Sequence, residues 1–266
     1  MAFWGCEFIF NGISCKTFDL MVYNTDGGTQ NDVSFPSFSK VHEERVPSRY
    51  SSYFYGSEQN EPLEFTITFG LNPDMLDSGK YLTRDVIASI TSWLTGSGGY
   101  KKLEILQDDL IGIYYMGRVS ELKLLTNGMM PYGFSCIFTC DSPFAYMAET
   151  EYACSVYGTE EIELWNSSTY NGFYMPRIVI QKHNYGDISI VNHSDGNREF
   201  RFSGISNGCV LYIDNSQQII TSETGDNPYS HFNFKFFRMK PRKNVITLSG
   251  AFDIRFIFNF PVNVGA

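Results

Sequence analysis

Charged residues, long apolar runs and histidines are all scarce in this sequence of 266 residues. Asp, Glu, Lys and Arg make up 18% of the chain, against ~25% in an average globular protein. No run of ~18 apolar residues is present, which argues against a membrane-spanning helix and membrane insertion. Met1 is not followed by a basic segment and an apolar stretch. We therefore expect no cleaved secretion signal and synthesis in a cytoplasm.

Recognisable catalytic motifs are missing as well. None of the four histidines has the spacing of a zinc peptidase, and no Gly-x-Ser-x-Gly elbow or phosphate-binding loop occurs. Asp108 and Asp109 are adjacent, so on a strand they would point to opposite faces and could not act as a pair. The sequence predicts no catalytic, metal or cofactor site and hence no enzyme.

An excess of basic residues is also absent. Residues 1–149 carry 10 Lys and Arg against 18 Asp and Glu, a net charge of −8, whereas residues 150–266 carry 10 against 11, a net charge of −1. A general nucleic-acid binder needs a basic face, so specific nucleic-acid binding is not expected. The acidic half would suit a surface that DNA passes without adhering.

The six cysteines do not indicate a disulfide framework. The chain is long and lacks a secretion signal, so buried free thiols in a reducing compartment are the better interpretation. Cys136 and Cys140 lie in a predicted strand, where four residues separate Cα atoms by about 13 Å, too far to share one zinc ion.

Aromatic residues, by contrast, are abundant at 16%, which favours strands. Asn11-Gly12 predicts a tight hairpin within residues 6–18, with Phe8 opposite Cys15. One helix is predicted, with Thr83 as its N-cap, an apolar stripe from Val86 to Leu94, and Gly96 as its end. Further strands of the first half are expected at these ranges: 38–45, 49–55, 63–71, 102–107, 113–119, 120–126 and 133–140.

The second half has the spacing of a β-sandwich, because predicted strands begin about every ten residues between polar turns. Residues 141–176 are expected to be a transition in which 162–165 is the only clear strand. The remaining predicted strands lie at 177–181, 188–192, 199–203, 209–214, 218–221, 232–237, 245–249 and 254–260. The fold class is therefore mainly β, with one helix in the first half.

A sugar-binding surface is a further hypothesis for the second half. It would combine an aromatic platform with polar groups, and Trp165, Asn166 and Tyr170 are the candidate contacts. No single strand pair carries a dense cluster of Trp, Asn, Arg and His, so strong glycan binding is not expected there.

Six segments, in order along the chain, resemble siphophage distal tail proteins. Each segment is mostly a pattern of strand and turn residues that many β-proteins share, so the likeness rests on the order and spacing of the segments. The segments are Phe8–Ser14, Phe18–Leu20, Val86–Leu94 followed by Tyr100–Leu103, Gly133–Tyr146, Gly208–Asp214 with Ile219–Thr221, and Asn244–Gly250.

The resemblance implies two domains, 1–145 and 146–266. The first would be a β-sandwich-like domain that forms a ring, hexameric by resemblance, at the distal end of the tail. The second would be a galectin-like β-sandwich. The ring domain of such proteins carries an extended hairpin or loop that hooks a neighbour, and residues 35–62 are the candidate. The aromatic residues expected at this oligomer interface are Phe35, Phe38, Tyr50, Tyr53, Phe54 and Tyr55.

The resemblance further implies a structural, non-enzymatic virion protein. It would join the tail tube to the tail tip and adsorption apparatus, contacting tail tube, tail-associated and receptor-binding proteins, and it would let DNA pass. It would be assembled in the bacterial host cytoplasm. Glu43, Glu44, Glu58, Glu61, Asp108 and Asp109 are candidate charges along the channel. The alternative is a carbohydrate-binding virion module that recognises host cell-wall sugar.

Overall fold

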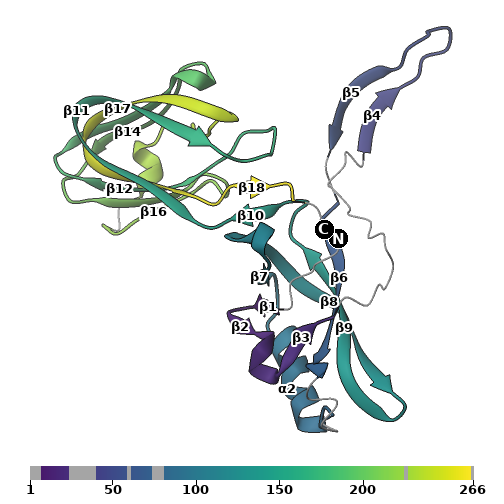
Figure 1. The fold of residues 1–266 in the computed structure, drawn as a ribbon. Coiled ribbons are helices and arrows are strands. Elements are labelled where there is room, and N and C mark those ends of the chain that lie inside the picture. The colour runs from purple at the N-terminus through teal and green to yellow at the C-terminus, as the bar shows by residue number, and fades with distance from the viewer. Residues whose placement is uncertain (1–6, 24–39, 59–60, 74–80, 225–226, 265–266) are drawn as a thin grey trace. The chain divides into compact units, whose positions relative to one another are not determined.

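The computed structural model describes residues 7–23, 40–58, 61–73, 81–224 and 227–264 (Figure 1). The fold is mainly β, and α2 (Arg84–Thr95) is the one α-helix whose whole length lies within those ranges. The chain divides into two compact units, Met1–Tyr146 with Asn263–Ala266, and Met147–Val262.

The first unit is built on one antiparallel sheet with the strand order β2-β1-β7-β8-β9-β6-β3. Strand β10 pairs with β8 beside this path. The bounds are β1 (Glu7–Phe10), β2 (Ile13–Ser14), β3 (Leu20–Val22), β6 (Glu64–Leu71), β7 (Lys101–Leu106), β8 (Ile113–Asn127), β9 (Met130–Cys140) and β10 (Ala145–Met147). A separate two-stranded sheet pairs β4 (Lys40–Glu44) with β5 (Tyr53–Glu58).

Helix α2 begins and ends as its sequence predicts. The Thr83 hydroxyl accepts a hydrogen bond from the Val86 N–H, which satisfies one of the unpaired donors of the first turn. The helix buries Trp93, whose Nε1 donates to the main-chain carbonyl of Phe10 at 2.9 Å. The indole also stacks on Phe8, with ring centroids 5.6 Å apart. A helix side chain thus joins the helix to the first strand of the sheet.

The predicted hairpin forms at Asn11-Gly12, where both residues have positive φ and Phe10 pairs with Ile13. Cys15 does not continue the second strand, because the chain turns there into the 3₁₀ helix η1 (Cys15–Phe18). Its sulfur still meets Phe8, whose N–H lies 3.5 Å from Sγ. The two strands expected at 113–119 and 120–126 are one strand, β8, with a bulge between Val119 and Glu121.

The second unit is a β-sandwich in which one long ribbon contributes to both layers. Its sheet has the order β14-β13-β17-β12-β15-β16, and β11 pairs with β17. The bounds are β11 (Thr150–Asn166), β12 (Arg177–Lys182), β13 (Gly186–Asn192), β14 (Arg198–Ile205), β15 (Val210–Asp214), β16 (Ile219–Ser222), β17 (Arg242–Phe258) and β18 (Pro261–Val262). Short 3₁₀ helices occur at η2 (Asp108–Leu110) in the first unit, and at η3 (His193–Asp195) and η4 (Pro228–His231) in the second.

The ribbon β11–β17 changes layers at a pair of glycines. Before Gly250, residues 246–249 of β17 pair with β13, and after it residues 252–257 pair with β12. Gly250 has φ +140° and pairs with Gly158, which has φ +104°. Both are backbone conformations that favour glycine. The bend lets a continuous pair of strands cover both sides of the core.

Three sequence expectations for this unit were wrong. Residues 150–166 are not a transition but the strand β11, which is mostly exposed and so lacks a regular apolar alternation. The strands expected at 245–249 and 254–260 are one strand, because Gly250 marks a bend and not a turn.

The third error concerns residues 232–237, which form no strand despite their alternating aromatic side chains. Phe232 and Phe237 are buried in the core, but Phe234 has φ +58°. Asparagine side chains replace a partner strand here: Asn215 Oδ1 accepts from the Phe237 N–H at 2.8 Å. The segment therefore covers the sandwich as an irregular, aromatic-rich strap.

Candidate assembly interface

The hairpin β4–β5 carries four of the six aromatic residues predicted to form an oligomer interface. Phe35 and Phe38 lie outside the described residues. The predicted strand 49–55 begins only at Tyr53, because Arg49 N–H closes a turn on the Val46 carbonyl at 3.2 Å. The paired strands have a bulge between His42 and Glu43.

The aromatic side chains of this hairpin are strongly exposed. Tyr50 is 101% exposed, Phe54 67%, Tyr55 64% and Tyr53 45%. Because successive residues of a strand point to opposite faces, Tyr53 and Tyr55 share one face and Phe54 lies on the other. Both faces of the hairpin thus present apolar rings, with Val41 adding a further exposed apolar side chain.

One face of the hairpin is ordered by its own contacts. The Arg49 guanidinium lies 3.8 Å from the centroid of the Tyr53 ring. Tyr53 stacks on Tyr55 with centroids 6.4 Å apart, and the Tyr55 hydroxyl donates to Glu44 Oε2 at 3.1 Å. This row of stacked groups fixes the rings before any partner is bound, which lowers the entropy cost of burying them.

The predicted sugar contacts have different environments. Trp165 is 61% and Tyr170 40% exposed, but Asn166 is buried at 2%. The Asn166 amide donates to the Lys240 carbonyl at 3.1 Å and accepts from the Ser168 N–H at 3.0 Å. Asn166 therefore holds the chain together and does not present its amide to a ligand, which removes the polar member of the predicted platform.

Four of the six candidate channel charges lie in two separate elements, β4 and η2. Glu43 and Glu44 are exposed on β4, and Glu44 is engaged by Tyr55. Asp108 and Asp109 lie in the 3₁₀ helix η2, where Gln107 Nε2 donates to Asp109 Oδ1 at 2.6 Å. Both carboxylates are exposed in this short helical turn and do not lie on a strand.

The described cysteines are free thiols, as predicted: Cys15, Cys136, Cys140 and Cys209 are buried and Cys154 is partly buried. Burial, and to a smaller extent the nearby Asp141, raises the pKa of Cys140 to about 12. Among the described residues no His, Cys, Asp and Glu side chains gather in a group able to hold a metal ion. Within the same ranges no helix has the length and apolar character needed to cross a membrane.

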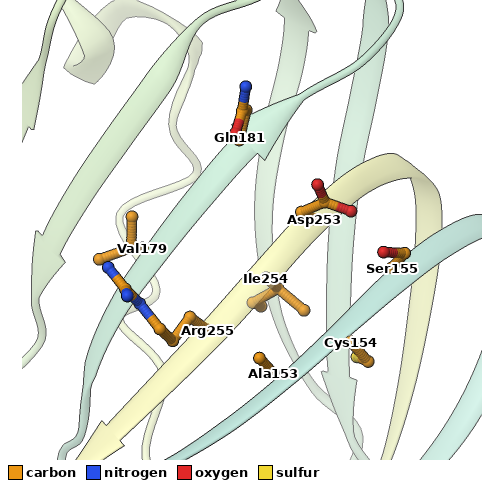
Figure 2. A pocket seen from close by; sticks show the side chains of 8 residues that line it. All are labelled: Ala153, Cys154, Ser155, Val179, Gln181, Asp253, Ile254 and Arg255. Atoms are coloured by element: carbon orange, nitrogen blue, oxygen red, sulfur yellow. The ribbon is translucent and has the colours of Figure 1, made fainter.

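Sequence reasoning missed a groove on the outer face of the second unit, where β11, β17 and β12 run side by side (Figure 2). Its polar side chains come from Ser155, Gln181 and Asp253, with Arg255 beside them. These residues are far apart in the sequence, and the strand β11 that brings Ser155 to the site was not predicted. No signal in a single segment could have revealed them.

Two family profiles match this chain along nearly its whole length. One, described as a phage tail protein N-terminal domain, matches residues 4–142. The other, described as a phage tail C-terminal domain, matches residues 144–258. A search of curated proteins finds no match.

A solved structure of a phage protein shares the fold. The Dit protein (gp 19.1) of SPP1, described as a paradigm of the hub adsorption apparatus in phages that infect Gram-positive bacteria, aligns with a TM-score of 0.67 and 12% identity. The alignment covers 96% of this chain and 98% of that protein. A chain of the phage P2 baseplate in its activated conformation with Ca aligns with a TM-score of 0.47 and 9% identity over 90% of each chain, a likeness too weak to support an argument.

Proposed function

Because this chain belongs to a family of phage tail proteins, we propose that it is a distal tail hub, which forms a ring between the tail tube and the adsorption apparatus. The observation that carries the proposal is the fold shared with SPP1 Dit over nearly the full length of both chains. SPP1 Dit is described as a hub of the adsorption apparatus, and the likeness to it extends over both family domains of this chain. We propose an assembly role and assign no reaction to the chain.

The hairpin β4–β5 supports the assembly role. An isolated two-stranded hairpin is at best marginally stable in water, and this one has no strand pairing with the main sheet in the described residues. Exposed Tyr, Phe and Arg are the residue types enriched at protein interfaces. We infer that a neighbouring copy buries Tyr53, Phe54 and Tyr55. Repeated head-to-tail contacts of this kind close into a ring, for which we propose six copies.

The other partners follow from the hub position. We propose that the ring contacts the tail tube protein on one side and tail-associated and receptor-binding proteins on the other. The protein would be assembled in the host cytoplasm and reside in the virion tail. Part of the acidic excess of residues 1–149 would face the lumen and keep passing DNA from adhering. A ring structure in which the lumen is lined by Lys and Arg, or in which Glu43, Glu61 and Asp108 all face away from it, would contradict this electrostatic role.

The ring is tested by the mass of the purified full chain, measured by light scattering and native mass spectrometry. We expect six chains for the wild type and dissociation for the triple variant Tyr53→Ser, Phe54→Ser and Tyr55→Ser. Each buried aromatic anchor contributes about 2 kcal/mol per interface, which is about thirtyfold in affinity. Trp165→Ser, which removes an equally exposed ring from the second unit, is the control and should leave the mass unchanged.

Two results would overturn the proposal. A wild-type protein that stays monomeric even with its tail partners present would contradict the ring. A triple variant that assembles like the wild type would show that the hairpin is not the contact.

A further inference from the structure

The groove on the outer face of the second unit has a volume of about 460 Å³ (Figure 2). This lies within the range of roughly 300–1,000 Å³ of small-molecule sites. The register of β11, β17 and β12 aligns the outward side chains in two rows that cross all three strands. One row is Ser155, Asp253 and Gln181, and the other is Ala153, Arg255 and Val179.

Asp253 lies at the centre of the polar row and is incompletely satisfied. Its Oδ2 is 3.0 Å from His183 Nε2. Hydrogen bonding with His183 first, and the Ser155 hydroxyl second, lowers the pKa of this carboxyl, so it is ionised at neutral pH. The Asp253 side chain is 44% exposed, so a ligand can reach the carboxylate. Within the described residues, neither Asp253 Oδ1 nor His183 Nε2 makes a hydrogen bond of good geometry, which leaves the carboxylate with capacity to accept a donor from a ligand.

An aromatic ring borders the same row. Tyr157 follows Ser155 by two residues on the same face of β11, and it stacks on His183 with ring centroids 5.6 Å apart and an interplanar angle of 9°. The phenol is 68% exposed, so its other face is open to solvent. The polar row is therefore flanked by a ring that is held in place by the partner of Asp253.

The groove offers side chains and no free backbone edge at its centre. Strand β17 is paired on both edges, with β11 and β12, and β12 is paired with β17 and β15. An extended peptide cannot add to these two strands, although β11 at the border of the groove pairs only with β17 among the described strands. At the centre of the groove the recognition groups are side chains: a carboxylate acceptor, a guanidinium donor, and an amide and a hydroxyl that both donate and accept. Opposite charges in one small groove disfavour a ligand with a strong charge of either sign.

We propose that this groove binds a short stretch of a neutral saccharide. Vicinal hydroxyls both donate and accept, which matches Asp253, Gln181 and Arg255, and the apolar face of a sugar ring fits the open face of Tyr157. The site differs from the platform around Trp165 that the sequence suggested. It does not depend on ring formation, so it stands or falls separately from the hub role.

The test is a glycan array probed with the full chain, followed by titration calorimetry with the best neutral oligosaccharide found. We expect a dissociation constant of about 0.1–1 mM, typical of few polar contacts. Asp253→Asn should weaken binding at least about tenfold, because it removes a charged acceptor. Gln181→Ala is the second variant, for the case that Asp253→Asn does not fold. The Gln181 side chain makes no hydrogen bond within the described residues, so its removal should leave the fold intact and also weaken binding.

The matched control is Glu161→Gln, an exposed carboxylate on the same strand, about 20 Å of strand away from Ser155. It should bind like the wild type. The proposal is overturned if no neutral glycan binds, if only anionic glycans bind, or if Glu161→Gln weakens binding as much as the groove variants do. Loss of binding in Trp165→Ala with full binding in both groove variants would move the site to the Trp165 surface and equally refute this proposal.

Discussion

The bend of the β11–β17 ribbon makes a sharp prediction, because its two paired glycines differ in their surroundings. A Cβ added at Gly250 would lie 2.8 Å from the Asp187 carbonyl oxygen and 2.9 Å from the buried ring of Phe252. A Cβ added at Gly158 would meet nothing within 4 Å. Both positions have positive φ, so both substitutions strain the backbone, but only one also collides with the main chain.

The expected costs follow from these two contributions. Backbone strain at such a φ costs about 1–3 kcal/mol, so Gly158→Ala should lower the free energy of unfolding by that amount. Overpacking against main chain and core adds about 1–3 kcal/mol, so Gly250→Ala should cost about 2–6 kcal/mol. Because both positions have positive φ, +104° at Gly158 and +140° at Gly250, the difference between the two variants reports mainly the collision at Gly250.

The assay is urea unfolding of the full chain, followed by circular dichroism and tyrosine fluorescence. Gly250→Ala should have the lower midpoint of the two variants, and both should lie below the wild type. Equal destabilisation of the two, or a larger loss in Gly158→Ala, would refute the reasoning that β17 bends tightly against β13 at Gly250.

Three further predictions concern the rest of the fold. Trp93→Phe keeps an aromatic six-membered ring but removes the indole N–H and the smaller ring, which leaves a main-chain carbonyl of β1 without its donor, so we expect a loss of at least about 1–3 kcal/mol in urea unfolding. An unchanged midpoint would contradict this. Cys140, whose pKa burial raises to about 12, should resist maleimide at pH ~8 while Cys154 reacts; labelling of Cys140 in the native state, detected by mass spectrometry, would be inconsistent. The pKa of the Asp187 carboxyl is lowered in the folded protein, first by hydrogen bonding to Arg201 and then by a main-chain N–H. The ionised carboxylate therefore stabilises the fold at a pH above the pKa of the unfolded chain, and this contribution is lost as the pH falls through the pKa of the folded protein. Asp187→Asn should thus lose less stability than the wild type between about pH 5 and pH 2, and a parallel loss would argue against the ion pair.

Much of the fold could be predicted because local chemistry determined it. The N-cap and the apolar stripe of helix α2 both favour a helix over a strand. Asn11-Gly12 is the preferred pair for the tight turn between β1 and β2. Strands with one buried face, such as β6, alternate clearly. The described thiols are free, as the sequence predicted.

The errors occurred where long-range pairing outweighs the local pattern. Strand β11 is exposed along most of its outer length and is held by β17, so its own residues do not reveal it. The strands expected at 245–249 and 254–260 are continuous through Gly250, because glycine fits a bend inside a strand as well as a break between two strands. The irregular strap at 232–237 has an alternating pattern but obtains its hydrogen bonds from asparagine side chains.

The candidate sites were predictable to different degrees. The exposed aromatic residues Tyr53, Phe54 and Tyr55 stand out in the sequence as a dense cluster. The groove around Asp253 does not, because three strands distant in the sequence must first be aligned. Asn166 shows the opposite case, since a residue that fits a binding platform in the sequence is buried in the structure.

The central claim is that this chain sits at the distal end of a phage tail, and immunogold electron microscopy of intact virions tests it most directly. Antibodies raised against the purified full chain, with pre-immune serum as the specificity control, would be applied to particles with extended tails. The account predicts gold label confined to the tail end opposite the capsid. Label along the whole tail tube, label at the capsid, or virions that contain none of the chain would contradict it.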